Sequence, residues 1–266
     1  MSNRFFTFLL IFSLVLVFLF LAIPLLLLVV EGWRGVGSAM ASDEVRFSLL
    51  LSMWTTTLAA IVCMAVAVCA GYALHLLGPV GKRIVSSVLS LPMALPHLVS
   101  GVALLLLYGR NGIGDWLFST FGIDFVFTTS GVVLALVFVN LSYAIIMMYT
   151  GYEEVGGRLE FIARTLGCSH FQAFSHVMLP LSRCTLVSTA VMTWSRALGE
   201  FGAVIMIAGT TRMKTEILPT TIFLNMSTGD LDIALAVSVI LILVSVCCIA
   251  LLGLFMPKHE KGWADA

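Results

Sequence analysis

Charged side chains are scarce in this chain of 266 residues. Asp, Glu, Lys and Arg together make up 11% of it, whereas 60% of the residues are hydrophobic. Soluble globular domains carry about 25% charged residues, so this composition excludes an ordinary soluble domain. The formal net charge is zero, which gives no sign of a nucleic-acid partner. The chain is predicted to be an integral membrane protein.

Motifs for metal binding and catalysis are also missing. The cysteines have no C-x-x-C pair and no metal-like spacing to histidine, and most lie in apolar runs as small hydrophobic residues: Cys63, Cys69, Cys168, Cys184, Cys247 and Cys248. The sequence lacks G-x-x-x-x-G-K-[ST], so "GPVGKR" at 78–83 is not a phosphate-binding loop. It also lacks H-E-x-x-H and any Ser-His-Asp-like order. These absences exclude ATP hydrolysis by the chain itself and argue against an intramembrane enzyme.

Long hydrophobic runs fill most of the sequence. A helix needs about 20 apolar residues to cross a bilayer. Six segments meet this requirement: 6–30, 48–77, 84–108, 130–150, 184–208 and 232–256. The first is longer than the roughly 7–15 apolar residues of a signal peptide, so we expect an uncleaved helix. The predicted fold class is an all-α membrane protein with six transmembrane helices.

The distribution of charge predicts the orientation of these helices. With the N-terminus inside, the inner segments hold eight basic residues and the outer segments five. Acidic residues have the opposite bias, with five inside and eight outside. Because Lys and Arg set topology, both termini and segment 153–183 are predicted to be cytoplasmic. The expected location is the plasma or inner membrane.

Segment 153–183 is more polar than the spans on either side of it. Glu153 to Leu166 has a helical composition, and Gly167 suits a helix C-terminus because glycine adopts left-handed backbone at little cost. Ser169 and Gln172 fit a capping box, which would begin a second short helix that ends at Pro180.

The second short helix is predicted to be amphipathic. Phe171, Phe174 and Met178 recur at spacings of three and four and give it one apolar face. Such a helix either lies in the lipid headgroup layer or docks in a groove of a partner protein.

The spacing within this segment resembles the coupling motif of ABC importer permeases, written EAA, three residues, G, nine residues, I-x-L-P. Gly167 and the run from Val177 to Pro180 match at the right spacing. The first half departs, because Phe161 stands in place of the motif's glutamate and Glu160 lies one position earlier. The resemblance implies contacts with an ATPase from Glu160, Arg164, Gly167, Ser169, Phe171, Phe174, Leu179 and Pro180.

Two further stretches resemble the permeases for molybdate, tungstate and sulfate. "WSRALGEFGAVIMIAG" at 194–209 is similar to their fifth span, and "LPMALPHLVSGVALLLLYGRNGIG" at 91–114 to their third span and the following loop. Pro96-His97 and "SGVALLLLYG" look most like the molybdate and tungstate group. Sulfate stays open, because these tetrahedral dianions differ mainly in size and a separate binding protein largely sets specificity in such systems.

Two charged residues, Arg196 and Glu200, fall within the fifth span. A charge at mid-membrane costs roughly 2.5–3.5 kcal/mol on insertion scales, so neither should face lipid. On a continuous helix the i, i+4 spacing lets the two charges neutralise each other. Arg196 either supplies positive potential to a passing oxyanion or only locks the helix into the bundle, and we favour the second. Gly199 and Gly202 indicate close packing or a bend.

Two prolines interrupt the third span. Pro92 and Pro96 free backbone groups that protein or a water-lined cavity must satisfy, unless they cause only an ordinary kink. His97 follows directly, and an interior histidine with a satisfied hydrogen bond is more common than a ligand. These three residues, with Arg196 and Glu200, are the candidates for a translocation pathway or the bundle core.

The resemblance implies a type I importer permease that works as a homodimer on two ATP-binding cassette subunits. It also implies an extracytoplasmic oxyanion-binding protein, no nucleic-acid partner, and no cofactor on this chain, because ATP and Mg belong to the partner subunits. We expect three regions: a first helix and outer loop (1–46), a transmembrane domain (47–256) and a cytoplasmic tail (257–266). A secondary transporter would need intramembrane ion ligands and an internal repeat, and a membrane enzyme would need convergent catalytic side chains.

Overall fold

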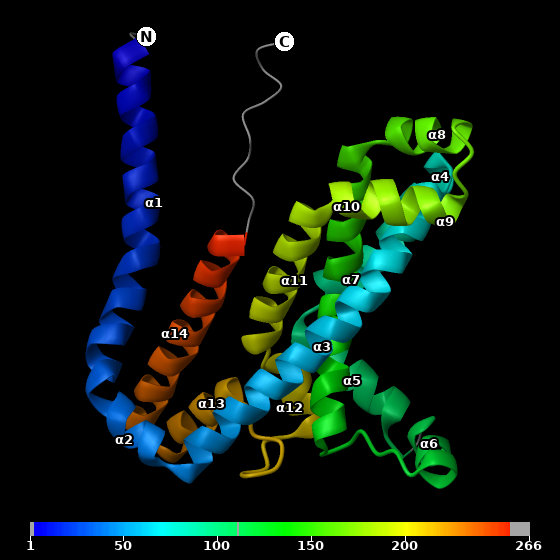
Figure 1. The fold of residues 1–266 in the computed structure, drawn as a ribbon. Helices are drawn as coiled ribbons and strands as arrows, with labels where there is room; N and C mark the ends of the chain where they lie inside the picture. Colours follow the sequence, from blue (N-terminus) through cyan, green and yellow to red (C-terminus); the bar gives the residue numbers. More distant parts are fainter. Residues whose placement is uncertain (1–2, 111, 256–266) are drawn as a thin grey trace.

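The computed structural model describes residues 3–110 and 112–255, which form helices joined by short connections (Figure 1). The predicted tail 257–266 and the last residue of the predicted sixth span lie outside the described residues. Four spans are single long helices: α1 (Asn3–Gly32), α3 (Asp43–Leu76), α7 (Thr129–Val155) and α14 (Leu231–Phe255). Their length and hydropathy suffice to cross a membrane.

The other two spans are each made of two helices with a sharp bend between them. α4 (Pro79–Ala94) and α5 (His97–Tyr108) meet at 102°, and α11 (Arg183–Leu198) and α12 (Gly202–Ala208) meet at 59°. With each bent pair counted as one span, all six predicted spans are found.

The bends have local causes. Leu95 precedes Pro96 and is extended (φ −79°, ψ 143°), as the residue before a proline prefers, so α4 cannot continue into α5. In the fifth span, Glu200 and Phe201 lie outside both helices, and the Glu200 side chain accepts a hydrogen bond from the Ala203 amide at the start of α12. The bend predicted from Gly199 and Gly202 is confirmed.

Short helices occupy both ends of the bundle. At one end lie a 3-10 turn (Trp33–Gly35), α2 (Val36–Ala41), α6 (Gly114–Phe121) and α13 (Leu218–Thr228), none of which the sequence predicted. At the other end lie α8 (Gly157–Thr165), α9 (His170–Ala173), a π-helical turn (Phe174–Met178) and α10 (Leu179–Leu181). The start of α1 lies at the same end as α8 and α9, in agreement with the predicted topology (Figure 1).

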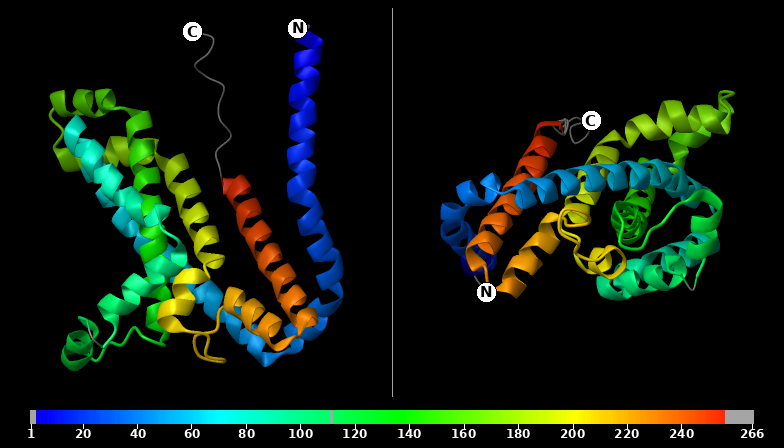
Figure 2. Two further views of the ribbon diagram at one scale, coloured as in Figure 1. Left: turned by 180° about the vertical axis from the view of Figure 1, so that it is seen from behind. Right: turned by 90° about the horizontal axis from the view of Figure 1, so that it is seen from below.

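The centre of the molecule is formed by α3, α7 and α11. Small residues allow these helices to approach closely: a Cβ added at Gly71 would lie 3.0 Å from the Cβ of Met148, and one at Gly151 would lie 2.5 Å from Thr185 Cγ2. α1 instead lies at the edge, where its last residues pack against the first turns of α14 before the two helices diverge (Figure 2). The most apolar stretch of α1 buries none of its residues, as expected for a helix that faces lipid.

Candidate coupling segment and membrane pathway

The coupling segment, residues 153–183, begins with a sharp change of direction. Gly156 has a φ of +77° and separates α7 from α8. The predicted single helix from Glu153 to Leu166 is therefore wrong, because Glu153 and Glu154 complete α7 and α8 starts anew at Gly157. Glycine permits this turn, since other residues rarely adopt a positive φ.

The two local signals around Gly167 are confirmed. Gly167 has a φ of +96°, its amide donates to the Arg164 carbonyl, and the Cys168 amide donates to the Ala163 carbonyl. These two hydrogen bonds end α8 in a Schellman motif. The capping box of α9 is also present: the Gln172 amide donates to Ser169 Oγ and the Ser169 amide to Gln172 Oε1.

Pro180 does not end the second short helix. The chain stays helical through Leu181, and Ser182 is the first residue outside. Before the proline the helix widens into a π-helical turn, in which the Leu179 amide donates to the Phe174 carbonyl. The missing amide of Pro180 is accommodated beside this wider turn, where a regular helix would place a carbonyl against the proline ring.

The predicted apolar face of this helix is divided between two environments. Met178 is fully buried, and the ring of Phe174 lies 4.5 Å from the Tyr72 ring and 6.2 Å from the Tyr152 ring. Phe171 instead points outward and is 74% exposed. Phe174 and Met178 therefore anchor the segment to its own bundle, and only Phe171 is free to contact a partner.

Four further exposed apolar side chains precede Phe171 in the coupling segment. We call this set together with Phe171 the docking face, and it consists of Leu159, Phe161, Ile162, Leu166 and Phe171. Exposed apolar clusters mark sites of protein or membrane contact. Of the other predicted coupling residues, Arg164, Ser169 and Pro180 are exposed and Leu179 is partly buried.

Glu160, the acidic residue one place before the motif position, points into the protein. It is 5% exposed, and its carboxylate accepts a hydrogen bond of 2.8 Å from the Tyr72 hydroxyl. His75 Nε2 lies 3.6 Å and His170 Nδ1 3.8 Å from the same carboxylate. The displacement by one residue thus moves the acidic group from the surface to the interface between α8 and α3.

A second carboxylate continues this network. His75 Nδ1 lies 2.6 Å from Glu153 Oε1, which also pairs with Lys82 Nζ at 2.5 Å. Sequence reasoning missed Tyr72, His75 and Lys82. The available signal was their position, because polar side chains at the inner end of an apolar span are expected to find partners there.

The predicted pairing of Arg196 with Glu200 is wrong. Glu200 Oε2 lies 2.6 Å from His97 Nδ1, and Glu200 Oε1 accepts a hydrogen bond of 3.0 Å from the Ala203 amide. The i, i+4 argument fails because α11 ends at Leu198, so the two residues do not share one helix. His97 is thus a paired histidine, and the pair joins the breaks in the third and fifth spans.

Arg196 has a different environment. Its guanidinium lies 4.9 Å from the centre of the Tyr143 ring on α7, a cation–π contact, and its side chain is exposed on the surface of the chain. Within the described residues no carboxylate pairs with it. The fifth span therefore carries an uncompensated positive charge.

The prolines of the third span lie on either side of its bend. Pro92 falls inside α4 and Pro96 caps the start of α5. α5 then packs against α12 with almost no space between them, because a Cβ added at Gly101 would lie 2.8 Å from the Ala203 carbonyl oxygen. The bend of 102° is thus more than an ordinary kink, and beyond it α5 packs closely on α12.

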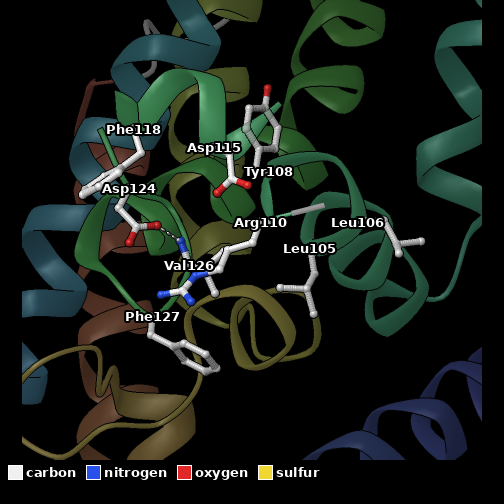
Figure 3. A pocket seen from close by; sticks show the side chains of 11 residues that line it. Leu105, Leu106, Tyr108, Arg110, Asp115, Phe118, Asp124, Val126 and Phe127 are labelled. Atoms are coloured by element: carbon white, nitrogen blue, oxygen red, sulfur yellow. Dashed lines mark hydrogen bonds between the residues drawn. The ribbon is translucent and has the colours of Figure 1, made fainter. Parts of the chain in front are cut away.

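A cavity of about 820 Å³ lies at the ends of α5 and α6, away from the predicted site residues (Figure 3). Arg110, Asp115 and Asp124 line it together with apolar side chains. Asp124 accepts a hydrogen bond of 2.9 Å from the Val126 amide, which holds the loop after α6.

Comparison with known proteins gives consistent matches over most of the chain. Residues 67–261 match the family model "Binding-protein-dependent transport system inner membrane component". The molybdenum transport system permease ModB of Mycobacterium tuberculosis is 33% identical over 241 residues, which is 90% of each chain. The sulfate permeases CysW of Synechocystis (34% identical; 68% of this chain and 67% of that one) and CysT of Escherichia coli (34%; 62% and 60%) also match.

Solved structures agree on the fold. A bacterial ABC transporter that imports the acidic polysaccharide alginate matches with a TM-score of 0.79 over 97% of both chains at 15% identity. The MetNI methionine ABC transporter matches with a TM-score of 0.62 over 81% of this chain and 97% of that one, also at 15% identity. Importers of this kind contain ATPase subunits and an extracytoplasmic binding protein besides the permease. The chain therefore belongs to the family of binding-protein-dependent inner membrane components, as a multi-pass ABC importer permease without ATPase activity of its own.

Proposed function

We propose that the chain carries a tetrahedral oxyanion, molybdate or tungstate, into the cell. The similarity to a molybdenum permease over 90% of both chains supports this substrate class. The observation that carries the proposal is the uncompensated charge of Arg196 in the fifth span.

The position of Arg196 makes it suited to attract an anion. It lies 13 residues after Arg183, or roughly 20 Å along the helix, well within the hydrophobic thickness of a bilayer. A guanidinium stays charged at all physiological pH values. Because it cannot face lipid without a large cost, its exposed side is expected to face a water-filled pathway or another protein.

We further propose that two copies of the chain form a homodimer, with Arg196 of each copy near the shared pathway. Each copy would engage one ATPase subunit through its docking face, in the way that apolar helix faces bind grooves of partner proteins. The network around Glu160 and His75 supports this role, because it ties α8 to α3 and α7. A movement imposed on the docking face would then reach the membrane helices.

The test is transport by the complete importer reconstituted in liposomes, with molybdate, tungstate and sulfate compared on matched binding proteins. We expect molybdate or tungstate uptake that depends on ATP, and at least a tenfold loss of uptake in Arg196→Met with the ATPase subunits still bound. Arg196→Lys keeps the charge and is expected to retain part of the activity. Normal oxyanion uptake by Arg196→Met would contradict the pathway role.

Sulfate is the second candidate substrate, because two kinds of sulfate permease match at 34% identity. They cover a smaller part of this chain, 68% and 62%, than the molybdenum permease does. Uptake of sulfate, and of neither larger anion, would favour this alternative.

A further inference from the structure

Two carboxyl groups meet at the outer end of the bundle, away from the coupling segment and the pathway residues. Glu216 precedes α13 and is fully buried, and neither of its carboxyl oxygens has a hydrogen-bond partner among the described residues. The carboxyl group of Glu44, in the first turn of α3, faces Glu216. No element of the proposed transport mechanism uses either residue.

The surroundings of Glu216 compensate a negative charge only in part. Arg212 on the same loop pairs with the other carboxyl, since its Nε lies 3.2 Å from Glu44 Oε1, and within the described residues no cation pairs with Glu216. The Thr221 hydroxyl, which donates to the Ile217 carbonyl, and the Met213 amide also face Glu216 and favour its charged form, but burial and the Glu44 carboxyl outweigh them. A buried, unpaired carboxylate beside a second carboxylate is strongly unfavourable, so the charged form of Glu216 is disfavoured.

The protonated form removes this difficulty. A neutral Glu216 has one O–H donor, which Glu44 can accept, while Arg212 compensates the single remaining negative charge. Burial raises the pKa of Glu216 to about 7, and the neighbouring Glu44 carboxyl adds to the rise. Glu216 can therefore take up and release its proton near neutral pH.

We propose that Glu44 and Glu216 form a proton-binding site on the outer face, in which one proton shared by the two carboxyls holds the 209–217 loop against α3. The loop connects α12 to α13, and the bond from the Leu218 amide to Ser52 Oγ joins its end to α3. Loss of the proton places a second negative charge inside this junction. The bound species is a proton, and a metal ion is disfavoured because no group of three acidic, His or Cys ligands occurs in the described residues.

The direction of the pH effect follows from linkage. The unfolded chain releases this proton near pH 4.5, whereas the folded protein keeps it to about pH 7. Between these values the folded state binds more protons, so stability falls as pH rises, and it levels off above about 7. Carboxyl groups with lowered pKa values give the opposite slope, which distinguishes this site from them.

The test is the thermal unfolding of the purified permease between pH 5 and 8, which does not depend on the identity of the transported substrate. We expect the wild-type melting temperature to fall across this range. Glu216→Gln mimics the protonated group and should flatten the decrease, remaining more stable than the wild type at pH 8. Glu44→Gln removes the second carboxyl and should also flatten it. Asp43→Asn, at the neighbouring side chain that is 91% exposed, is the matched control and should keep the wild-type slope.

Two further measurements make the test specific. Infrared spectroscopy of the wild type at pH 6 should detect a protonated carboxyl group, and this signal should be lost in Glu216→Gln. This measurement does not depend on how stable the variant is. Addition of Na⁺, K⁺ or Ca²⁺ at pH 8 should leave the wild-type melting temperature unchanged. A slope that persists in both glutamine variants would overturn the proposal, as would stabilisation by a cation that Glu216→Gln abolishes.

Discussion

Glu200 is buried between the breaks of the third and fifth spans, and each of its carboxylate oxygens contacts one of the two spans. Oε2 meets His97, the first residue of α5, and Oε1 accepts the Ala203 amide near the start of α12. A single carboxylate thus holds together the bends of the third and fifth spans. Arg196 takes no part in this arrangement, which leaves its charge available for another purpose.

The Glu200–His97 pair yields the first stability prediction. Glu200 is buried but the His97 side chain is 42% exposed, so removal of one partner is expected to cost less than the about 3–5 kcal/mol typical of a fully buried pair. His97→Phe is therefore expected to lower the melting temperature in detergent by several degrees, and the double variant with Glu200→Leu to recover much of the loss. Arg196→Met is the matched control, since it strands no carboxylate and should melt close to the wild type. A single variant as stable as the wild type would contradict the pairing.

Two kinds of tertiary contact hold the coupling segment in place, because its helices are too short to be stable by themselves. α9 has four residues and α8 has nine, lengths at which isolated helices are unstable in water. Ring contacts from Phe174 to Tyr72 and Tyr152 fix the second half, and the carboxylate of Glu160 fixes the first. The docking face is left outside these contacts.

A pair of phenylalanine substitutions separates anchoring from docking. Phe171→Asp changes an exposed side chain and is expected to abolish ATPase binding and transport while the permease keeps its melting temperature. Phe174→Asp places a charge among packed aromatic rings and should detach the segment and lower stability. Co-purification with the ATPase and thermal unfolding of each variant provide the two measurements. Equal effects of both substitutions on stability would refute this division.

Local signals in the sequence predicted much of this region, and contacts between distant residues account for the rest. Gly167 and the Ser169–Gln172 box depend on neighbouring residues, and the structure confirms both. The partner of Glu200 was missed because His97 lies about 100 residues earlier, and spacing within one helix cannot reveal it. Similarly, hydropathy located all six spans, but it carries no information on the 102° bend or on α13 inside an outer loop.

Taken as a whole, the chain exposes apolar surface on several sides, and these sides face different surroundings. α1 exposes side chains all round, with no charged residue in its most apolar stretch, as a lipid-facing helix does. The exposed face of α11 is different, because Arg196 and Met192 lie one turn apart on it. A face that carries an unpaired guanidinium is suited to water or protein and not to lipid.

Thiol labelling tests this difference between the two faces. Maleimides react with the thiolate, which forms in water and not in hydrocarbon. In a variant without the six native cysteines, Met192→Cys is expected to react with a water-soluble maleimide in at least one nucleotide state of the importer. Phe18→Cys on α1, at a side chain with greater exposure (67% against 43%), should stay unreactive in every state. Labelling of Phe18→Cys together with protection of Met192→Cys in all states would place the α11 face against lipid or a permanent protein contact. Arg196 would then have no access to a passing anion.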